Sequence, residues 1–516
     1  MASASANHRR KPVAAARRLD ALLATAAGLL VLAVHDVGYL LKVPYWLDES
    51  WVVAFTRMPL SSLRHAIGPS PAIWTLLVRL QVFGGFQRQR VVPLVFAGLA
   101  VAAGYALFRV LGHGRPVALV FGAGTVLLAP AMLARDDLKQ YTADAFVLVL
   151  LLVLVARLDA SWTRGRVLTL GVVVGLAPGL SSAALFGGTA AMAAVVVAVL
   201  VAQRWDRLRS LAAAIAIAVV GDVFWLLVFL LPNTNQALID YWRPEYPPRS
   251  VSGVYDYLSS RAPVARAGVG VDSLWVVAAL LLLGVVVLLA RRRVATALTV
   301  PLAAAGVLVA GLLHLSPVLD ARTSTWLFVG VDLVMAVGIA GLAREVARRR
   351  RVVGAALALV LLAVPAVLFA AAAWPGLRST TLIPDEDVRG PEQYVAAHRG
   401  PDDVVVVDFG ASYAWAYYAQ LDVVPVPSST SGTGFDVKFP PSSRVIMVPQ
   451  AGSAAVGVTL RRAESLTGGR PGARIWVVRS HMHPDEARRW AAAVQVHRLR
   501  TVDGGWPVPL LVEPAG

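Results

Sequence analysis

Long apolar runs separated by short basic segments dominate the first 373 residues. A helix of about 20 apolar residues crosses the hydrocarbon core of a bilayer, so each run predicts a membrane span. Eleven spans are predicted, at 20–41, 91–108, 117–134, 141–156, 167–180, 183–202, 211–231, 271–290, 296–314, 325–343 and 352–373. The pattern therefore predicts a mainly α-helical, polytopic membrane protein with about eleven transmembrane helices.

Two longer stretches between these spans, 42–90 and 232–270, are predicted to be outer loops. Segment 71–83 in the first loop is apolar but too short to span the bilayer comfortably, so it predicts a helix at the membrane surface. The second loop is rich in Tyr, Trp, Pro and Arg. These aromatic residues favour either an acceptor or head-group site, or an aromatic belt at the membrane interface.

The last part of the chain, 374–516, has a different pattern, in which short β-branched runs alternate with helical segments. Strands are expected at 404–409, 444–448, 475–478 and 494–502, and helices at 391–398, 411–420 and 484–494. This alternation predicts a small α/β domain, and about 140 residues are enough for a separate core. The predicted organisation is a basic N-terminus (1–19), a membrane domain (20–373) and an extracytoplasmic α/β domain (374–516).

The composition excludes several classes of protein. The chain is 57% hydrophobic and only 15% charged, whereas soluble domains carry about 25% charged residues. The absence of cysteine excludes disulfides, thiolate zinc sites, iron–sulfur clusters and a cysteine nucleophile. The sequence has no G-x-G-x-x-G, no Walker A, no H-E-x-x-H and no G-x-S-x-G motif, which argues against a nucleotide-sugar donor and an ATP-driven pump.

The net charge of +17 predicts an orientation in the membrane. On a soluble protein it would suggest nucleic-acid binding. Here the predicted cytoplasmic segments contain 21 Lys and Arg and only four acidic residues, so they hold the whole excess. Positive residues favour the cytoplasmic side. We therefore expect a cytoplasmic N-terminus, an external tail at 374–516, and no nucleic-acid partner.

Two acidic clusters fall on the predicted outer side. Asp48 and Glu49 follow the first span, and Asp136, Asp137 and Lys139 lie between the third and fourth spans. A carboxylate can accept the proton of an attacking hydroxyl, while a cation holds a phosphate leaving group. The same carboxylates suit a divalent cation. The alternative is that short outer loops are simply polar.

Other polar residues lie within or beside the predicted spans. Arg322 begins a span on the outer side, where its forked donors suit a lipid phosphate or pair with Asp320. Asp222 and Asp332 lie deep in their spans, where a structural role is preferred, although a proton-coupled transporter also needs such groups. Further candidates to line a substrate cavity are Trp51, Gln140, Tyr141 and His314.

The tail contains His481 and His483, followed by Asp485 and Glu486. Histidines at this spacing with carboxylates are one possible set of metal ligands. The preferred interpretation is a strand exit followed by a helix that carries both acids in its first turn.

Several segments together resemble the GT-C membrane glycosyltransferases, and more closely the bacterial relatives of the dolichyl-phosphate-mannose protein mannosyltransferases. An outer Trp-Leu-Asp-Glu-Ser segment at 46–50 follows the first span. The matching segments further on are Arg-Val-Val-Pro at 90–93, Asp-Leu-Lys-Gln-Tyr-Thr-Ala-Asp at 137–144, Asp-Ala-Arg at 320–322, and the tail segments 407–411 and 416–418.

The resemblance implies sugar transfer from a polyprenyl-phosphate-linked donor to an envelope glycan, lipid or protein. Such a hexosyl- or pentosyltransferase works on the outer face of the bacterial cytoplasmic membrane and inverts the anomeric centre. It implies Asp48 as the base with Glu49 beside it, Asp136 and Asp137 as supporting carboxylates, and Lys139 and Arg322 as groups that neutralise the donor phosphate. Lys139 and Arg322 are therefore the residues expected to bind the donor phosphate.

Two other functions fit the same residues. One is a transporter or flippase for a lipid-linked sugar, although no internal repeat supports it. The other is a non-catalytic subunit of envelope assembly. The enzyme hypothesis requires Asp48, Lys139 and Asp136 or Asp137 to meet on one side of the membrane.

Overall fold

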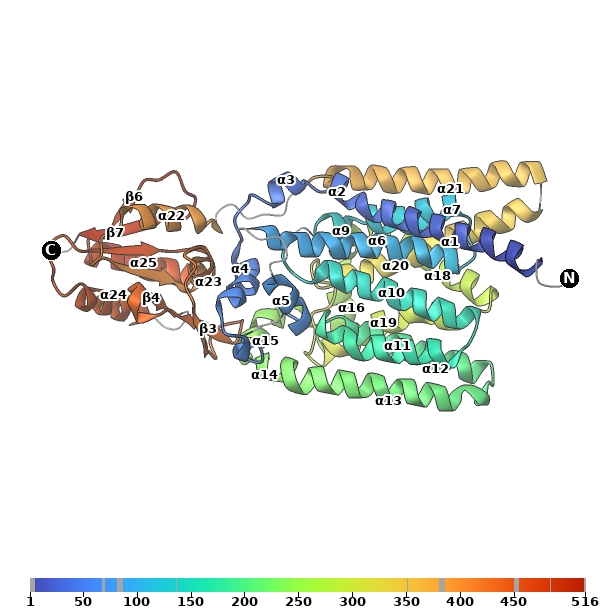
Figure 1. Ribbon diagram of the computed structural model, residues 1–516, viewed down its shortest axis with the longest axis horizontal. Coiled ribbons are helices and arrows are strands. Elements are labelled where there is room, and N and C mark those ends of the chain that lie inside the picture. The colour runs from blue at the N-terminus through green and yellow to red at the C-terminus, as the bar shows by residue number, and fades with distance from the viewer. Residues whose placement is uncertain are drawn as a thin grey trace.

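The computed structural model describes residues 5–66, 70–80, 87–135, 137–349, 351–379, 386–449, 454–482 and 484–514. It is elongated, with a bundle of long helices at one end and a smaller α/β unit at the other (Figure 1). The N-terminus lies at the far end of the bundle and the C-terminus lies in the α/β unit. The two ends of the chain thus lie at opposite ends of the molecule.

Each of the eleven predicted spans contains helical structure. The long bundle helices are α1 (Ser5–Leu29), α6 (Val91–Val110), α10 (Tyr141–Ala160), α11 (Arg164–Leu176), α12 (Ala184–Val201), α13 (Leu208–Trp225), α18 (Leu274–Ala290), α19 (Val294–Leu312), α20 (Thr325–Arg349) and α21 (Arg351–Ala373). The segment predicted at 117–134 is broken into α7 (Arg115–Val117), a π-helical stretch η4 (Ala118–Ala123), α8 (Gly124–Leu128) and α9 (Pro130–Leu133).

Length and composition identify fewer spans than the sequence pattern. Among the described residues, six helices are long and apolar enough to cross a membrane. A bent pair, α17 (Ala262–Val269) and α18, meets the same criterion when its two parts are taken together. Among the remaining predicted spans, α11 has only 13 residues.

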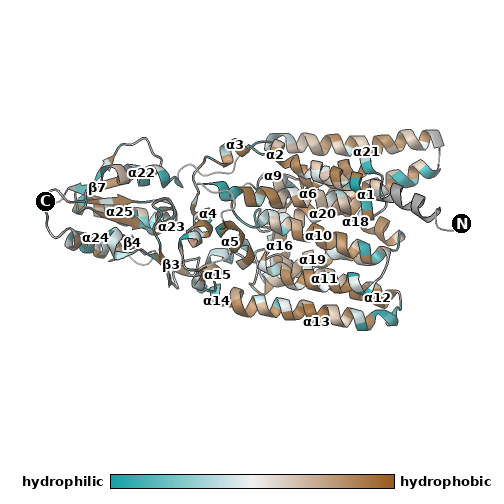
Figure 2. Ribbon diagram, viewed as in Figure 1, coloured by the Kyte–Doolittle hydropathy of each residue, from teal (hydrophilic) through white to brown (hydrophobic). Residues whose placement is uncertain are grey.

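Burial separates the centre of the bundle from its rim. In α20, 83% of the apolar stretch is buried, compared with 11% in the α13 segment and in α21. The two rim helices are hydrophobic along most of their length (Figure 2). Because an apolar helix with little protein cover needs an apolar surrounding, α13 and α21 suit a position that faces lipid.

Small residues bring the helices of the bundle into close contact. A Cβ atom on Gly104 of α6 would lie 2.5 Å from the carbonyl oxygen of Gly122, and the reverse distance is also 2.5 Å. Neither position has room for a side chain, so the two backbones touch directly. Such contacts are typical of helix packing in membranes, where dispersion contacts must replace the hydrophobic effect.

The α/β unit is built on a five-stranded sheet of order β4-β1-β5-β7-β6. Strands β4, β1 and β5 are parallel, and β7 and β6 continue the sheet in antiparallel fashion. The strands are β1 (Val404–Asp408), β4 (Val445–Val448), β5 (Arg474–Val478), β6 (Arg500–Val502) and β7 (Leu510–Pro514), with a separate hairpin of β2 (Val424–Pro427) and β3 (Phe435–Lys438).

Helices cover both faces of this sheet. Alternate valines of β1 point to opposite sides: Val405 and Val407 pack in a cluster with α23 (Phe409–Tyr418), and Val404 and Val406 pack with α24 (Ala454–Thr467) and α25 (Pro484–Val496). A central parallel strand buried on both faces is expected to be uniformly apolar. This explains the unbroken run of four valines.

The α/β prediction is confirmed, with errors near the C-terminus. The segment predicted as one strand at 494–502 contains the end of α25, a turn and the short β6. The sequence reading also missed α24, β7 and the β2–β3 hairpin. The segment after His481 begins α25 with Asp485 and Glu486 in its first turn, as the preferred interpretation predicted. His483 lies outside the described residues.

The predicted outer loops lie between the bundle and the α/β unit (Figure 1). The first contains α4 (Leu47–Ala54) and α5 (Ala72–Arg79), and the second contains α15 (Gln236–Trp242), α16 (Val251–Ser260) and α17. Tyr45 of the first loop stacks on Tyr418 of α23 at 6.4 Å between ring centroids, and its backbone N–H donates to the Tyr418 hydroxyl at 2.8 Å. The α/β unit is therefore packed directly against the segment that carries Asp48.

Candidate active site

Asp48 and Arg322 form an ion pair across 274 residues of sequence. Asp48 lies in the first turn of α4, and Arg322 lies in the turn before α20. Arg322 Nη1 donates to Asp48 Oδ2 at 2.8 Å, and the two side chains are 24% and 17% exposed. The pair is therefore fixed in place yet reachable from outside the protein.

Arg322 is held in this position by its surroundings. Its Nη2 donates to the Tyr241 hydroxyl at 3.3 Å, and its guanidinium lies 5.9 Å from the ring centroid of Trp242. The alternative partner, Asp320, accepts a hydrogen bond from the Arg322 backbone N–H at 3.0 Å instead. Asp320 thus shapes the turn, and the guanidinium is directed toward Asp48.

Glu49, next to Asp48, has a different environment. Arg90 donates to both of its carboxylate oxygens, from Nε at 2.8 Å and from Nη2 at 2.5 Å, and both side chains are fully buried. The backbone N–H groups of Leu138 and Trp46 also donate to Glu49, at 2.8 and 3.3 Å. Glu49 therefore joins α4 to the start of α6 and to the segment that carries Lys139.

Lys139 belongs to the same cluster as the ion pair. Its side chain is buried, and its Nζ lies 4.9 Å from the ring centroid of Trp51. Burial lowers the pKa of Lys139, the carboxylates of Asp48 and Asp137 oppose this shift, and Arg322 adds to it. The structure thus brings Asp48, Asp137, Lys139 and Arg322 into one electrostatic cluster.

The second acidic cluster is described in part. Asp137 is buried and pairs with Arg135 at 3.9 Å, and the Arg135 guanidinium lies 5.8 Å from the ring centroid of Tyr141. Gln140 is buried at the N-cap of α10. Asp136 lies outside the described residues.

His314 lies in a different setting from the other candidates. It is exposed in the turn after α19 and stacks on Tyr246, with 5.0 Å between ring centroids. Trp51, by contrast, lies against Lys139 and makes an edge contact with Tyr413 of the α/β unit. Of the predicted cavity residues, Trp51 thus has a direct contact with the cationic part of the cluster.

Two residues that the sequence reading did not assign to the site support α4. The buried Glu386 accepts a hydrogen bond from the backbone N–H of Leu47 at 2.6 Å, directly beside Asp48, and its other oxygen is paired with His481 Nδ1. This bond to Glu386 raises the pKa of His481, although burial opposes the shift. No local signal marks Glu386, because its partners are 95 and 339 positions away.

Metal-binding geometry occurs elsewhere among the described residues. Asp48 is engaged by Arg322 and Glu49 by Arg90. Among the described residues, one group has ligand atoms close enough together to hold a metal. It consists of Glu464, His497 and Glu513, in the α/β unit.

Neither a protein-family model nor a curated protein matches the sequence. Among solved structures, ArnT from Cupriavidus metallidurans bound to undecaprenyl phosphate matches with a TM-score of 0.54 at 16% identity, covering 95% of this chain and 97% of that one. ArnT in the apo state matches with a TM-score of 0.55 at 15% identity, covering 97% and 99%. The chain shares the fold of ArnT.

A third structure, the Archaeoglobus fulgidus oligosaccharyltransferase in complex with Zn and sulfate, matches with a TM-score of 0.47 at 11% identity, over 89% of this chain and 67% of that one. The likeness to ArnT confirms the predicted GT-C fold, in which a multi-pass membrane domain is followed by a small sheet domain. At these identities the likeness concerns the fold, and the reaction has to be argued from the site.

Proposed function

We propose that this protein is an inverting glycosyltransferase that moves a sugar from a polyprenyl-phosphate-linked donor to an envelope glycan, lipid or protein. The observation that carries the proposal is the Asp48–Arg322 pair, which lies with Lys139 where the membrane bundle meets the α/β unit. A base and two cations in one partly open cluster provide what transfer from a phosphate leaving group requires.

Asp48 is the base in this proposal. Its carboxylate takes the proton of the acceptor hydroxyl while the acceptor oxygen bonds to the anomeric carbon. The bond from that carbon to the phosphate oxygen breaks, and polyprenyl phosphate leaves with the electron pair. Attack opposite the leaving group inverts the anomeric centre.

Arg322 and Lys139 neutralise the departing phosphate. The forked guanidinium suits two phosphate oxygens, whereas the ammonium acts as a compact charge. Because Arg322 is paired with Asp48, a bound phosphate competes with Asp48 for the guanidinium. Donor binding then frees the base for the acceptor.

The neighbouring carboxylates have supporting roles. Glu49, enclosed by Arg90 and two backbone donors, positions α4 so that Asp48 faces Arg322. Asp137 shapes the site beside Lys139, the resemblance implies the same role for Asp136, and Trp51, Gln140 and Tyr141 line the site. His314, in the turn after α19, stacks on Tyr246 of the second outer loop. Lys139 and Arg322 supply positive charge here, and a divalent cation at Asp48 and Asp137 is the alternative source of that charge.

The donor class is supported by the fold. The ArnT structure with undecaprenyl phosphate covers nearly the whole of both chains. The rim helices α13 and α21 are largely exposed, which suits a protein surrounded by lipid. The excess of positive charge at the bundle end favours a cytoplasmic N-terminus and a site on the outer face of a bacterial cytoplasmic membrane.

The test uses purified protein in lipid with radiolabelled polyprenyl-phosphate hexoses and pentoses and envelope fractions as acceptors. Wild type should form a labelled glycosidic product, and Asp48→Asn should reduce its rate by about 10²–10⁴-fold, the usual effect of losing a general base. Asp402→Asn is the matched control, because Asp402 pairs with an arginine, Arg470, far from the cluster.

Two results would contradict the proposal. Transfer that is equally fast in Asp48→Asn and wild type removes Asp48 from the base role. Movement of the lipid-linked sugar across the membrane without a new glycosidic bond identifies a transporter instead.

A further inference from the structure

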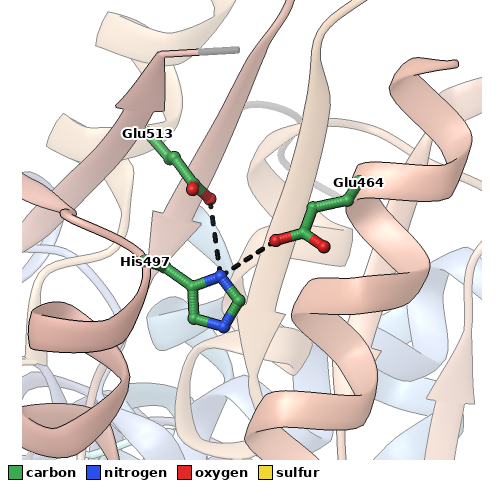
Figure 3. Close-up of side chains that lie close together, drawn as sticks. All are labelled: Glu464, His497 and Glu513. Carbon is green, nitrogen blue, oxygen red and sulfur yellow. Dashed lines mark hydrogen bonds and ion pairs between the residues drawn. The ribbon is translucent and has the colours of Figure 1, made fainter. Parts of the chain in front are cut away.

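Three potential metal ligands from three elements converge on the α/β unit (Figure 3). Glu464 lies on α24, His497 directly follows α25, and Glu513 lies on β7. The distances from His497 Nδ1 are 2.9 Å to Glu464 Oε1 and 3.9 Å to Glu513 Oε2. All three ligand atoms lie within 4.8 Å of one another.

The hydrogen bonds within this cluster leave one of its carboxylate oxygens without a partner among the described residues. Nδ1 carries at most one hydrogen, and its short contact is with Glu464. The Oε2 atom of Glu513 is buried and has no hydrogen-bond partner among the described residues. A buried carboxylate oxygen without a partner is costly, so the arrangement calls for a further group.

We propose that Glu464, His497 and Glu513 bind a divalent transition-metal cation such as Zn²⁺. One imidazole nitrogen and two carboxylate oxygens suit Zn²⁺, whereas Mg²⁺ and Ca²⁺ prefer oxygen ligands alone. A cation bound to Nδ1, Glu464 Oε1 and Glu513 Oε2 would satisfy the buried oxygen and balance both carboxylate charges.

The exposures of the three residues suit such a site. His497 and Glu513 are 13% and 19% exposed, whereas Glu464 is 45% exposed. The first two therefore form a fixed base, and the third leaves an entry path and room for a water ligand. Zinc bonds of about 2.0–2.2 Å place ligand atoms about 3.3–3.6 Å apart, so only small side-chain shifts are needed.

The site is structural and independent of the proposed transfer. Glu513 pairs with Ile475, which in turn pairs with Val404 at the start of β1. His481, beyond the other end of β5, contacts Glu386 beneath α4. The metal would therefore connect α24, the end of α25 and β7. This connection lies beside the start of β1 and β5, at the end of these strands that is away from Asp48.

The experiment uses the full-length protein in detergent, purified without a polyhistidine tag and stripped with a chelator. After equilibration with Zn²⁺ and dialysis, elemental analysis should find about one zinc per chain, and Zn²⁺ should lengthen the half-life on heating. Glu464→Gln should weaken binding at least tenfold. The change is at the most exposed ligand and preserves shape, so misfolding would not explain the loss. His497→Ala should abolish binding.

The matched control is His398→Gln. His398 is an exposed histidine on α22 (Arg389–His398) whose Nδ1 contacts the Tyr394 carbonyl oxygen at 2.8 Å, so its loss should leave zinc binding unchanged. The proposal is overturned if wild type retains no zinc, or if Glu464→Gln and His497→Ala retain as much zinc as wild type. Equal retention of Mg²⁺ and Zn²⁺ in separate trials would also overturn it.

Discussion

The adjacent carboxylates of Asp48 and Glu49 should respond to amidation in opposite ways. In Glu49→Gln, the fully buried Arg90 guanidinium keeps its charge but loses its counter-ion and one of the two acceptors that it now contacts at 2.8 and 2.5 Å, because the amide NH2 group cannot accept. Removing one partner of a buried pair costs about 3–5 kcal/mol. Three carbonyl oxygens, of Leu40, Val43 and Pro44, still accept from Arg90, so the lower value, about 3 kcal/mol, is expected.

Asp48→Asn should have little effect on stability. The Asp48–Arg322 pair is partly exposed, and ion pairs of this kind contribute about 0–1 kcal/mol. A loss of about 3 kcal/mol lowers the ratio of folded to unfolded protein more than 100-fold, whereas a loss of 1 kcal/mol lowers it about fivefold. Glu49→Gln should therefore be clearly less stable than Asp48→Asn. Asp48→Asn should in turn have the lower transfer activity per folded molecule.

The stability assay needs no substrate. Each variant is heated in detergent, and the fraction that remains monodisperse is followed by size-exclusion chromatography to give a half-life. The double variant Glu49→Leu, Arg90→Leu tests the cause, because removing both charges leaves none unpaired and should recover part of the loss. Our reasoning is refuted if Glu49→Gln is as stable as wild type, or if Asp48→Asn is equally destabilised.

Three further results are expected. Arg322→Lys keeps the charge but loses the forked donor, so the KM for the donor should rise about tenfold or more; an unchanged KM would remove Arg322 from phosphate binding. The pKa of His481 is raised by Glu386, so their contact stabilises the fold at low pH and is lost as the pH rises through the raised pKa; heat stability should fall as the pH rises above the ordinary histidine pKa of about 6.5 in wild type, and less so in His481→Gln. Gly104→Ala places a methyl group 2.5 Å from the Gly122 carbonyl oxygen, so it should destabilise the bundle by about 1–3 kcal/mol in the same heating assay, and a neutral effect would contradict the close packing.

The sequence predicted those parts of the fold that depend on periodicity and charge. Apolar runs gave the positions of all eleven helical segments, and the four consecutive valines of β1 gave a strand. The break at η4 was not predictable, because its apolar composition is the same as that of a straight helix. The strand β6 has only three residues, and the β-branched residues at the end of α25 extended the strand predicted there to 494–502.

The site was predictable in its residue types and less so in its pairings. Asp48, Lys139 and Arg322 stood out because charged residues beside a membrane need an explanation. Their convergence depends on contacts over 274 positions of sequence, which no spacing rule supplies. For the same reason Arg90 was seen only as the entry to a span, although it is the fully buried partner of Glu49.

Helix geometry explains why two neighbouring acids have separate environments. Successive residues of an α-helix point about 100° apart, so adjacent side chains do not share a face. In α4, the side that carries Glu49 faces Arg90 and Leu138, and Asp48 is turned toward Arg322 at the open side. An Asp-Glu pair at the start of a short helix can thus fix the helix with one carboxylate and present the other to a substrate. Exchanging the two residues, Asp48→Glu with Glu49→Asp, keeps the charge but shortens the buried side chain by one methylene. We expect this exchange to lose stability through the gap at Arg90, even though the composition of the site is unchanged.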